Sequence, residues 1–422
     1  MTERQVYIHI QLPETLQLVP AALLKVTRHE DGTYLGKFRY GDRYIERNDA
    51  VALDPFQLPL GNDTYEFTKL KGLPGAIRDG APDAWGRRVI EHKLEKDSAN
   101  LEEIDYLVHG PQEGAGYLTF GTGPEPPPPR RPYNRAQQLA DLISAAEAVE
   151  DGRRVPEYLL EQLEPGTSMG GARPKATVEH DGRLWLAKFP EREDRLNLQR
   201  VEFATLELAR ACGLRVAQAH LQQVGGRDVL MLERFDRRST QGGHFRLGMV
   251  SALTMLDADD GYTSRDRWSY LLLADQIRRW SSEPQSDCAE LFLRMVFNAA
   301  VTNNDDHPRN HAMLRQAEGW RLSPAYDLVP TPLISVERRD LALTVGAFGR
   351  TASVYNLLSS CERFGFSEAA AREQIRRIAA VVSHWRAEFA KAGVADQDMK
   401  SIAPAMLPES FLRETSPDPV AG

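Results

Sequence analysis

Six prolines fall within the twelve residues from Gly121 to Pro132, in the sequence GTGPEPPPPRRP. Proline has no amide hydrogen and a fixed φ, so such a run cannot continue a helix or lie inside a sheet, and it favours an extended backbone. We therefore expect a linker over residues 121–134, with one folded region before it and the rest of the fold after it.

Length and charge limit the class of protein further. At roughly 100–200 residues per domain, 422 residues allow two or three folded units. The formal net charge of −8 argues against an intrinsic nucleic-acid-binding protein, because phosphate contacts need a basic surface. No apolar run approaches the ~20 residues of a membrane-spanning helix, and the start, MTERQVYIHIQLPE, lacks the features of a secretion signal. We expect a cytoplasmic protein whose three widely spaced cysteines are reduced.

A β-hairpin is predicted between Lys175 and Lys188. Asp181-Gly182 is the signal of a two-residue turn, and it lies between the segments KATVEH and RLWLAKF. Such a turn sets Lys175 directly opposite Lys188, and Val178 opposite Trp185. Because facing like charges destabilise a strand pair, the two lysines indicate an anion bound between them.

Apolar residues at helical spacing predict three helices. Asn197–Cys212 has one apolar stripe and ends at Gly213. Leu291–Val301 is apolar on nearly every face, which is typical of a buried helix. A last strong helix should begin after Ser367 as N-cap and carry one apolar face as far as Phe389.

A polar cluster follows the predicted buried helix and contains the residue types that phosphoryl transfer needs. This reaction needs a cation on the phosphates, carboxylate and amide oxygens for magnesium, and a carboxylate near the acceptor hydroxyl. Asp305 and Asn310 have the spacing of the catalytic aspartate and the metal-binding asparagine in a protein-kinase loop. Asp327 follows a short predicted strand, and Lys188 ends an apolar strand upstream. Together they predict a base, two metal ligands and a phosphate-binding lysine.

Other interpretations of these residues stay open. An Asp-x4-Asn pair considered alone is usually a solvated turn, and a lysine at a strand end is often only an edge residue. A catalytic transition metal in a hydrolase is a further alternative, since the cluster offers carboxylate and imidazole ligands in Asp305, Asp306, His307 and His311. That alternative leaves Lys188 and the segment ERFDR without a role, so we rank it below a kinase.

Six motifs, in this order, resemble those of one family, the HipA toxin kinases, which are the partners of HipB-type antitoxins. They are SMGGARPK from Ser168, AKFP around Lys188, VEFATLELARACGL from Val201, ERFDR from Glu233, NNDDHPRN ending at Asn310, and SPAYDLVPT around Asp327. The stretch DGAPDAWGRR from Asp79 also resembles the accessory domain of that family, so the resemblance spans most of the chain.

The resemblance implies a role for each matching residue. Asp305 would accept the proton of the acceptor hydroxyl, and Asn310 and Asp327 would bind magnesium. Glu202 on the predicted helix would position Lys188, as in the lysine–glutamate pair of kinases, with Glu207 as the less favoured alternative. The residues implied for ATP binding are Gly170, Gly171, Ala172, Arg173, Pro174, Lys175, Lys188, Glu233, Arg234, Phe235, His307, Asn310, Tyr326 and Asp327.

Ser168 resembles the serine that is autophosphorylated in the family, a modification that expels the phosphate-side loop and silences the kinase. A dianionic group inside a phosphate site would be repelled and would disorder its loop. The alternative is that Ser168 only closes a turn. The sequence departs from eukaryotic kinases because it lacks DFG, HRD and a GxGxxG before the lysine strand, and Arg309 stands where many relatives carry lysine.

We therefore expect an α+β, two-lobed protein-kinase-like fold with a mixed β-sheet N-lobe, a helical C-lobe and an N-terminal accessory domain. The expected boundaries are 1–120 for the accessory domain, 121–134 for the linker, 135–238 for the nucleotide-binding lobe, 239–408 for the helical catalytic lobe and 409–422 for a disordered tail.

The resemblance implies an ATP- and Mg²⁺-dependent serine/threonine protein kinase that acts as the toxin of a toxin–antitoxin pair. It would phosphorylate an aminoacyl-tRNA synthetase to arrest translation and growth, and would inhibit itself by autophosphorylation. Its partners would be a HipB-like helix-turn-helix antitoxin and, mainly through that antitoxin, operator DNA. The alternative is a regulatory subunit of a DNA complex with an antitoxin repressor and with little kinase activity. The intact set of Asp305, Asn310, Asp327 and Lys188 argues against this alternative.

Overall fold

The computed structural model describes residues 1–128, 133–163, 171–331, 339–408 and 411. The N-terminal region is built around an antiparallel five-stranded sheet in the order β4-β3-β2-β1-β5. Alternate residues of β1, Val6, Ile8 and Ile10, are fully buried, because successive side chains of a strand point to opposite faces of the sheet. The strands are β1 (Thr2–Gln11), β2 (Leu18–Arg28), β3 (Tyr34–Tyr40), β4 (Thr64–Phe67) and β5 (Leu118–Gly121).

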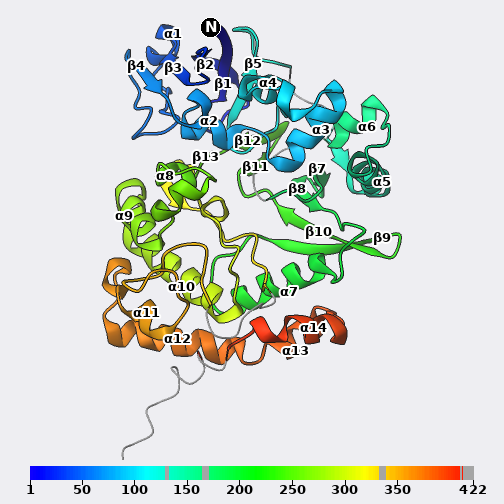
Figure 1. The fold of residues 1–422 in the computed structure, drawn as a ribbon, viewed down its shortest axis with the longest axis vertical. Coiled ribbons are helices and arrows are strands. Elements are labelled where there is room, and N and C mark those ends of the chain that lie inside the picture. Colours follow the sequence, from blue (N-terminus) through cyan, green and yellow to red (C-terminus); the bar gives the residue numbers. More distant parts are fainter. Residues whose placement is uncertain (129–132, 164–170, 332–338, 409–410, 412–422) are drawn as a thin grey trace, which may run out of the picture.

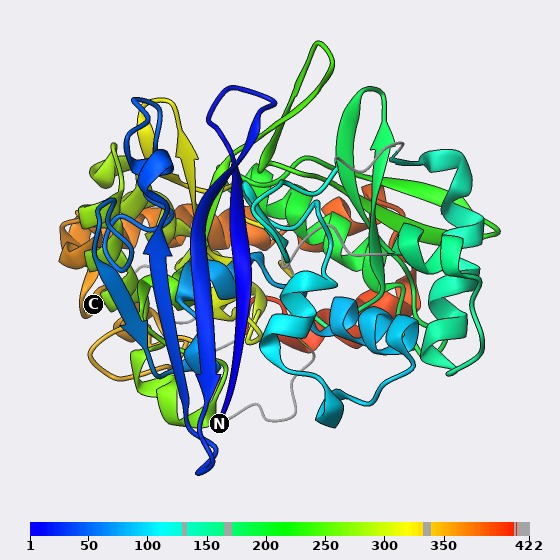
Figure 2. The ribbon, with the colours of Figure 1, turned by 90° about the horizontal axis from the view of Figure 1, so that it is seen from above.

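Four helices accompany this sheet. They are α1 (Asp42–Ile45), α2 (Gly75–Gly80), α3 (Ala84–Leu94) and α4 (Glu103–Val108). Helix α3 begins after Asp83, whose side chain accepts a hydrogen bond from the Gly86 amide at 2.9 Å and so caps the helix. Figures 1 and 2 show α3 on the side of the N-terminal region that faces helices α5 (Leu139–Glu150) and α6 (Glu157–Leu163).

A second five-stranded sheet follows, in the order β6-β7-β8-β10-β9. It is mixed, because β6 runs parallel to β7 while the other neighbours are antiparallel. Its strands are β6 (Asn134–Arg135), β7 (Lys175–His180), β8 (Arg183–Lys188), β9 (Ala219–Val224) and β10 (Arg227–Glu233). Helix α7 (Leu198–Ala211) packs on this sheet after its N-cap Asn197.

The predicted hairpin is confirmed residue by residue. Asp181 and Gly182 both have left-handed backbones, with φ of 49° and 71°, as a tight hairpin turn requires. Lys175 therefore lies opposite Lys188, and Val178 opposite Trp185.

The remaining chain is mainly helical, and in Figure 1 its helices α8 and α9 lie beside the second sheet while α11 to α14 lie along the bottom of the molecule. Its helices are α8 (Ala252–Met255), α9 (Tyr270–Trp280), α10 (Pro284–Val301), α11 (Val354–Leu358), α12 (Glu368–Val382), α13 (Trp385–Lys391) and α14 (Asp396–Ile402). Two small sheets, β11-β12 and β13-β14-β15, belong to the same part of the chain; their strands are β11 (Arg237–Thr240), β12 (Gly243–Arg246), β13 (Gly248–Ser251), β14 (Ala312–Gln316) and β15 (Gly319–Leu322). Helix α10 is buried along most of its length, as predicted.

The predicted last helix is wrong in one respect. It begins after Ser367 as expected, but it ends at Val382, and the apolar face continues on the separate helix α13. At the break, the Ser383 hydroxyl donates to the Ala380 carbonyl oxygen at 2.7 Å, a local hydrogen bond typical of serine at a helix end. Trp385 and Phe389 still pack with the core of the lobe.

Several other expectations concern the ends and connections of the chain. Between β5 and residue 128 the backbone forms neither helix nor strand, whereas 129–132 of the expected linker and 409–422 of the expected tail, apart from Phe411, lie outside the described residues. The three cysteines are buried free thiols. Within the described ranges, the helices are all too short or too polar to cross a bilayer.

Candidate active site

Lys188 lies at the end of β8 and is held by two carboxylates. Its Nζ donates to Glu202 Oε1 and to Asp327 Oδ1, each at 2.7 Å. Glu202 is on the buried side of α7. The side chain of Glu207, on the same helix, is 40% exposed and pairs instead with Arg210. Of the two glutamates considered from the sequence, Glu202 therefore contacts the lysine.

The ionisation of this cluster follows from its mutual contacts. Burial alone would lower the pKa of Lys188, but Asp327 and Glu202 outweigh it and raise this pKa. Burial would likewise raise the pKa of Asp327, but Lys188 holds it below its ordinary value. Burial dominates at Glu202 and raises its pKa. At neutral pH the cluster therefore presents a cationic lysine beside an ionised Asp327.

The polar cluster predicted after the buried helix lies next to this lysine. Helix α10 ends where Thr302 adopts a left-handed φ of 52°, and the loop beyond it carries Asp305 and Asn310. The Asn310 side-chain nitrogen donates to the main-chain oxygen of Asp305 at 3.3 Å. Asp327 also has a left-handed φ, of 59°, a conformation that non-glycine residues adopt mainly where the surrounding structure enforces it. Asp305, Asn310, Asp327 and Lys188 line one cavity of about 320 Å³.

Asp305 and His307 differ in their surroundings. Burial raises the pKa of Asp305, and the nearby charge of Asp327 adds to this. His307 packs edge-on against the Trp268 ring at 4.1 Å between centroids, and its Nδ1 accepts a hydrogen bond from the Arg309 amide at 3.1 Å. Burial lowers the pKa of His307 to about 4, so this imidazole is neutral at pH 7.

A second cavity, of about 580 Å³, shares Asp305, Asn310 and Asp327 and opens towards the N-terminal region. Its other walls combine the two parts of the chain: Leu70, Lys71, Leu73, Arg78, Pro82, Asp83, Ala84, Arg87 and Glu103 come from the N-terminal region, and Gly171, Ala172, Asp260, His307 and Arg309 from the rest. The polar cluster is therefore reached through a space that both parts enclose.

The alternative of a transition-metal site is wrong for these residues. The Asp306 carboxylate is buried and accepts from the Tyr270 hydroxyl, with His311 Nε2 3.1 Å away. His307 instead faces Trp268 and Asp260. Across the part of the chain that the structure describes, no group of three or more His, Cys, Asp or Glu side chains is arranged to hold a metal ion.

The predicted phosphate-side loop borders the same cavities. Gly171, Ala172, Arg173 and Lys175 line the smaller one, while Ser168 and Gly170 lie outside the described residues. Pro174 is buried, and its carbonyl oxygen accepts from the Phe189 amide at 2.9 Å.

The charges of the loop are neutralised by carboxylates of the chain itself. Arg173 pairs with Asp194 at 2.8 Å, and Lys175 pairs with Asp83 at 2.5 Å. The anions expected beside the facing lysines Lys175 and Lys188 are thus protein carboxylates.

The segment ERFDR connects the two lobes. The Phe235 ring packs against the Tyr326 ring with 5.3 Å between the ring centroids. The Glu233 carboxylate pairs with the Arg183 guanidinium at 3.2 Å. The Arg234 side chain points away from the cavities: it is buried, pairs with Asp236 at 2.8 Å and donates to the carbonyl oxygens of Glu113 and Gly114. Any contact of Arg234 with a nucleotide would therefore involve its main chain.

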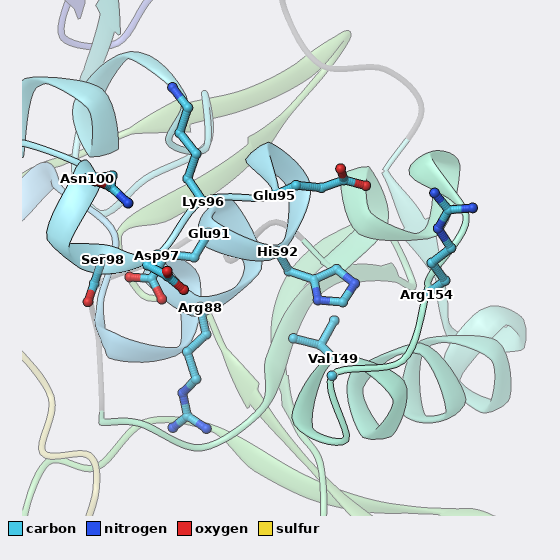
Figure 3. Close-up of a pocket in the computed structure, with 11 residues that line it drawn as sticks. Arg88, Glu91, His92, Glu95, Lys96, Asp97, Ser98, Asn100, Val149 and Arg154 are labelled. Carbon is cyan, nitrogen blue, oxygen red and sulfur yellow. The ribbon is translucent and has the colours of Figure 1, made fainter.

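The residues that the sequence reasoning missed come mostly from the N-terminal region. Asp83, Arg78 and Arg87 line the cavity of about 580 Å³, and the sequence motifs assigned no role to any of them. All three lie in or beside the stretch DGAPDAWGRR, whose resemblance to the accessory domain implies no role for a single residue. A separate cavity of about 840 Å³, between α3 and the end of α5, contains none of the predicted site residues (Figure 3).

The lysine with its two carboxylates, the Asp305–Asn310 loop and the two-lobed α+β fold define a protein with a kinase-like fold. The family described as "HipA-like C-terminal domain" matches residues 167–385, which is just over half of the chain. The chain therefore belongs to the HipA family of kinases.

Two curated relatives show low sequence identity to this chain. The chain is 24% identical over 213 residues to the serine/threonine-protein kinase toxin HipA of Shewanella oneidensis, across 43% of this chain and 47% of that protein. It is 29% identical over 148 residues to Y4mE of Sinorhizobium fredii, a kinase by inference only, across 34% of this chain and 35% of that protein. The chain thus matches about a third to a half of the length of these curated relatives.

The structural likeness extends further than the sequence likeness. The solved HipA of Shewanella oneidensis, in a complex with HipB and operator DNA, superposes with a TM-score of 0.67 at 17% identity. The match covers 97% of this chain and 96% of that one. The predicted two-lobed fold with its N-terminal region is therefore confirmed.

Proposed function

We propose that this chain is an ATP- and Mg²⁺-dependent serine/threonine protein kinase. The observation that carries the proposal is the position of Lys188 between Glu202 and Asp327, in one cavity with Asp305 and Asn310. Protein kinases combine a lysine held by a glutamate, a metal-binding aspartate and a catalytic-loop Asp-x4-Asn in the same way.

The side chains at the cavity suit a magnesium–nucleotide. Mg²⁺ prefers oxygen ligands and typically takes one or two protein carboxylates together with phosphate oxygens and water. Asp327 offers an ionised carboxylate, and because the nitrogen of Asn310 is hydrogen-bonded to Asp305, its oxygen is the atom suited to the metal. When bound, the ion neutralises charge on the phosphates. Lys188, Lys175 and Arg173 supply cations around them.

In this proposal Asp305 accepts the proton of the attacking serine or threonine hydroxyl. Burial raises its pKa, which makes the carboxylate a stronger base than an exposed aspartate. The neutral His307 and the main chain of Glu233 to Phe235 contact the nucleotide. The protein substrate enters through the cavity of about 580 Å³, between the N-terminal region and the loop of Asp305.

We extend the proposal to a toxin of a toxin–antitoxin pair that works in the cytoplasm. The name of the Shewanella relative, and its complex with HipB and operator DNA, support a helix-turn-helix antitoxin as partner. The antitoxin supplies most DNA contacts, because a net charge of −8 gives this chain little attraction for phosphates. The family resemblance favours an aminoacyl-tRNA synthetase as substrate, and autophosphorylation of Ser168 as the inhibitory step.

The test is the intact mass of the purified chain after incubation with ATP and Mg²⁺, with and without a panel of purified aminoacyl-tRNA synthetases. We expect one added phosphate on the parent chain, none on Ser168→Ala, and phosphate on one synthetase with the parent and with Ser168→Ala. Asp305→Asn should bind ATP and transfer nothing. ATP binding without transfer to any protein would instead support the regulatory subunit.

A further inference from the structure

Asp83 makes two contacts that belong to different parts of the molecule. Its carboxylate caps helix α3 of the N-terminal region by accepting from the Gly86 amide at 2.9 Å. It also pairs with Lys175 Nζ at 2.5 Å, at the start of β7, where Lys175 further donates to the Gly171 carbonyl oxygen at 2.7 Å. The side chains of Asp83 and Lys175 are only 9% and 1% exposed, so water does not screen this pair.

Two neighbours on α3 hold the same loop. Trp85 Nε1 donates to the Lys175 carbonyl oxygen at 3.1 Å, and Arg88 Nη2 donates to the Ala172 carbonyl oxygen at 3.0 Å. Trp85 is also buried in one hydrophobic cluster with Ala187 of β8. The first turns of α3 thus contact both the main chain and the side chain of the loop Gly171–Lys175.

The two facing lysines are held in matching ways. Lys188 is held by Glu202 of α7, within the second sheet and its helix, whereas Lys175, directly opposite, is held by Asp83 from the N-terminal region. Both lysines line the cavity that contains Asp305 and Asp327. A buried lysine keeps one orientation only while a carboxylate holds it, because its four-carbon side chain is flexible.

We propose that Asp83 is a positioning residue for the nucleotide: it orients Lys175 towards the phosphates, as Glu202 orients Lys188, while Arg88 fixes the loop main chain. The nucleotide site is then composite, and it is incomplete without helix α3. This inference rests on the proposed kinase function. It assigns to the N-terminal region a part in binding ATP itself, in addition to enclosing the cavity of about 580 Å³.

The variant Asp83→Asn separates the two contacts of Asp83, because asparagine caps a helix as well as aspartate does but carries no charge. We would measure the dissociation constants of the full chain for MgATP and for adenosine by calorimetry. Losing a buried charged hydrogen bond should weaken MgATP binding by about tenfold or more. Adenosine binding should stay unchanged, since adenosine has no phosphates. The double variant with Lys175→Gln should bind MgATP about as weakly as either single variant.

Arg88→Ala offers a milder test, because Arg88 is exposed and its removal disturbs no core. It should weaken MgATP binding by about two- to fivefold. Arg154 lines the same neighbouring cavity, but Figure 3 shows its side chain and that of Arg88 pointing away from each other. Arg154→Ala is therefore the matched control and should bind MgATP as the parent does.

Each outcome decides the inference. Unchanged MgATP binding in Asp83→Asn and Arg88→Ala, with a parent chain that binds MgATP, would overturn the positioning role and leave the kinase proposal intact. Equal losses for MgATP and adenosine, with a lower melting temperature, would show a merely structural role and also overturn it. A parent chain that binds no MgATP would overturn the kinase proposal and this inference together. If Asp83→Asn does not fold, Arg88→Ala and its control Arg154→Ala decide between the same results.

Discussion

Lys188 Nζ and Asp327 Oδ1 are 2.7 Å apart although 139 positions separate the two residues in the chain. The contact joins the end of β8 to the segment that follows β15, so it exists only when both lobes are folded and correctly placed. Because Glu202 approaches the same lysine from α7, three separate elements converge on one ammonium group. The geometry of this cluster therefore reports directly on whether the site is assembled.

Glu202→Gln should lower the rate of phosphoryl transfer at saturating ATP. The amide is isosteric but uncharged, so Lys188 keeps Asp327 and loses its second carboxylate, and a misplaced group in an active site costs roughly 10- to 100-fold in rate. Steady-state autophosphorylation or synthetase phosphorylation measures the effect. Glu207→Gln, on the same helix with a side chain that is 40% exposed, should keep the parent rate. Equal rates of phosphoryl transfer for Glu202→Gln and Glu207→Gln would contradict a role of Glu202 in positioning Lys188.

His307 should make the protein less stable in acid. Its folded-state pKa of about 4 lies below the 6.5 of a free imidazole, so the unfolded chain binds a proton between these pH values and the folded chain does not. The contribution of the neutral His307 to the free energy of unfolding is fully present above pH 6.5. It is lost as the pH falls towards 4, which lowers the free energy of unfolding by up to about 3 kcal/mol. His307→Gln should flatten that part of the curve in denaturant titrations from pH 7 to pH 4. His384→Gln, at an exposed position, should leave it as steep as in the parent.

Arg234→Met should destabilise the fold without touching the cavity. Arg234 is 1% exposed and holds Asp236 together with the Glu113 and Gly114 carbonyl oxygens. Removing one partner of a buried ion pair costs up to about 3–5 kcal/mol, and Asp236 would keep only one cationic partner, Arg237 at 2.7 Å. Urea unfolding measures the loss. The neighbouring Arg238 is exposed, and Arg238→Met should change the free energy of unfolding by less than about 0.5 kcal/mol.

Gly36→Ala should be among the more harmful single-methyl additions in the N-terminal sheet. A Cβ at this position of β3 would lie 1.7 Å from the Gly72 carbonyl oxygen, so the two backbones would have to separate. We expect a loss of about 3 kcal/mol or more in the free energy of unfolding. Gly61→Ala adds the same methyl group where the nearest atom, the Tyr65 hydroxyl oxygen, is 3.8 Å away. A melting temperature of Gly36→Ala equal to that of Gly61→Ala would contradict this close approach.

Local signals predicted much of the fold. The Asp181-Gly182 turn predicted the register of β7 and β8, Ser367 as N-cap marked where α12 begins, and apolar spacing predicted α7 to within one residue at each end. Apolar spacing failed to show the break at Ser383, because Trp385 and Phe389 on the next helix pack into the same core as the apolar face of α12. Spacing reports which face is buried, and it does not report whether the backbone stays helical.

The site was predicted less evenly. The ordered motifs, read through the family resemblance, pointed to Asp305, Asn310, Asp327 and Lys188, which the structure brings into one cavity. The Asp83–Lys175 pair joins positions 92 residues apart, and neither spacing nor turn chemistry within one segment encodes such a contact. For the same reason, the sequence could not distinguish an Asp306 buried against Tyr270 and His311 from a metal ligand.

The hydrogen bonds between ERFDR and the N-terminal region form late in the synthesis of the chain, because their two sides lie far apart in the sequence. Arg234 and Arg237 donate hydrogen bonds to the carbonyl oxygens of Glu113 and Gly114. These two acceptor residues leave the ribosome about 120 residues before the arginines do. At ~5–20 residues per second, this delay is on the order of ten seconds. Asp327 emerges later still. A newly made chain therefore has a period in which its N-terminal strands are present and the contact of Lys188 with Asp327 has not yet formed, and a partner that recognises those strands early would meet the protein before this cluster is assembled.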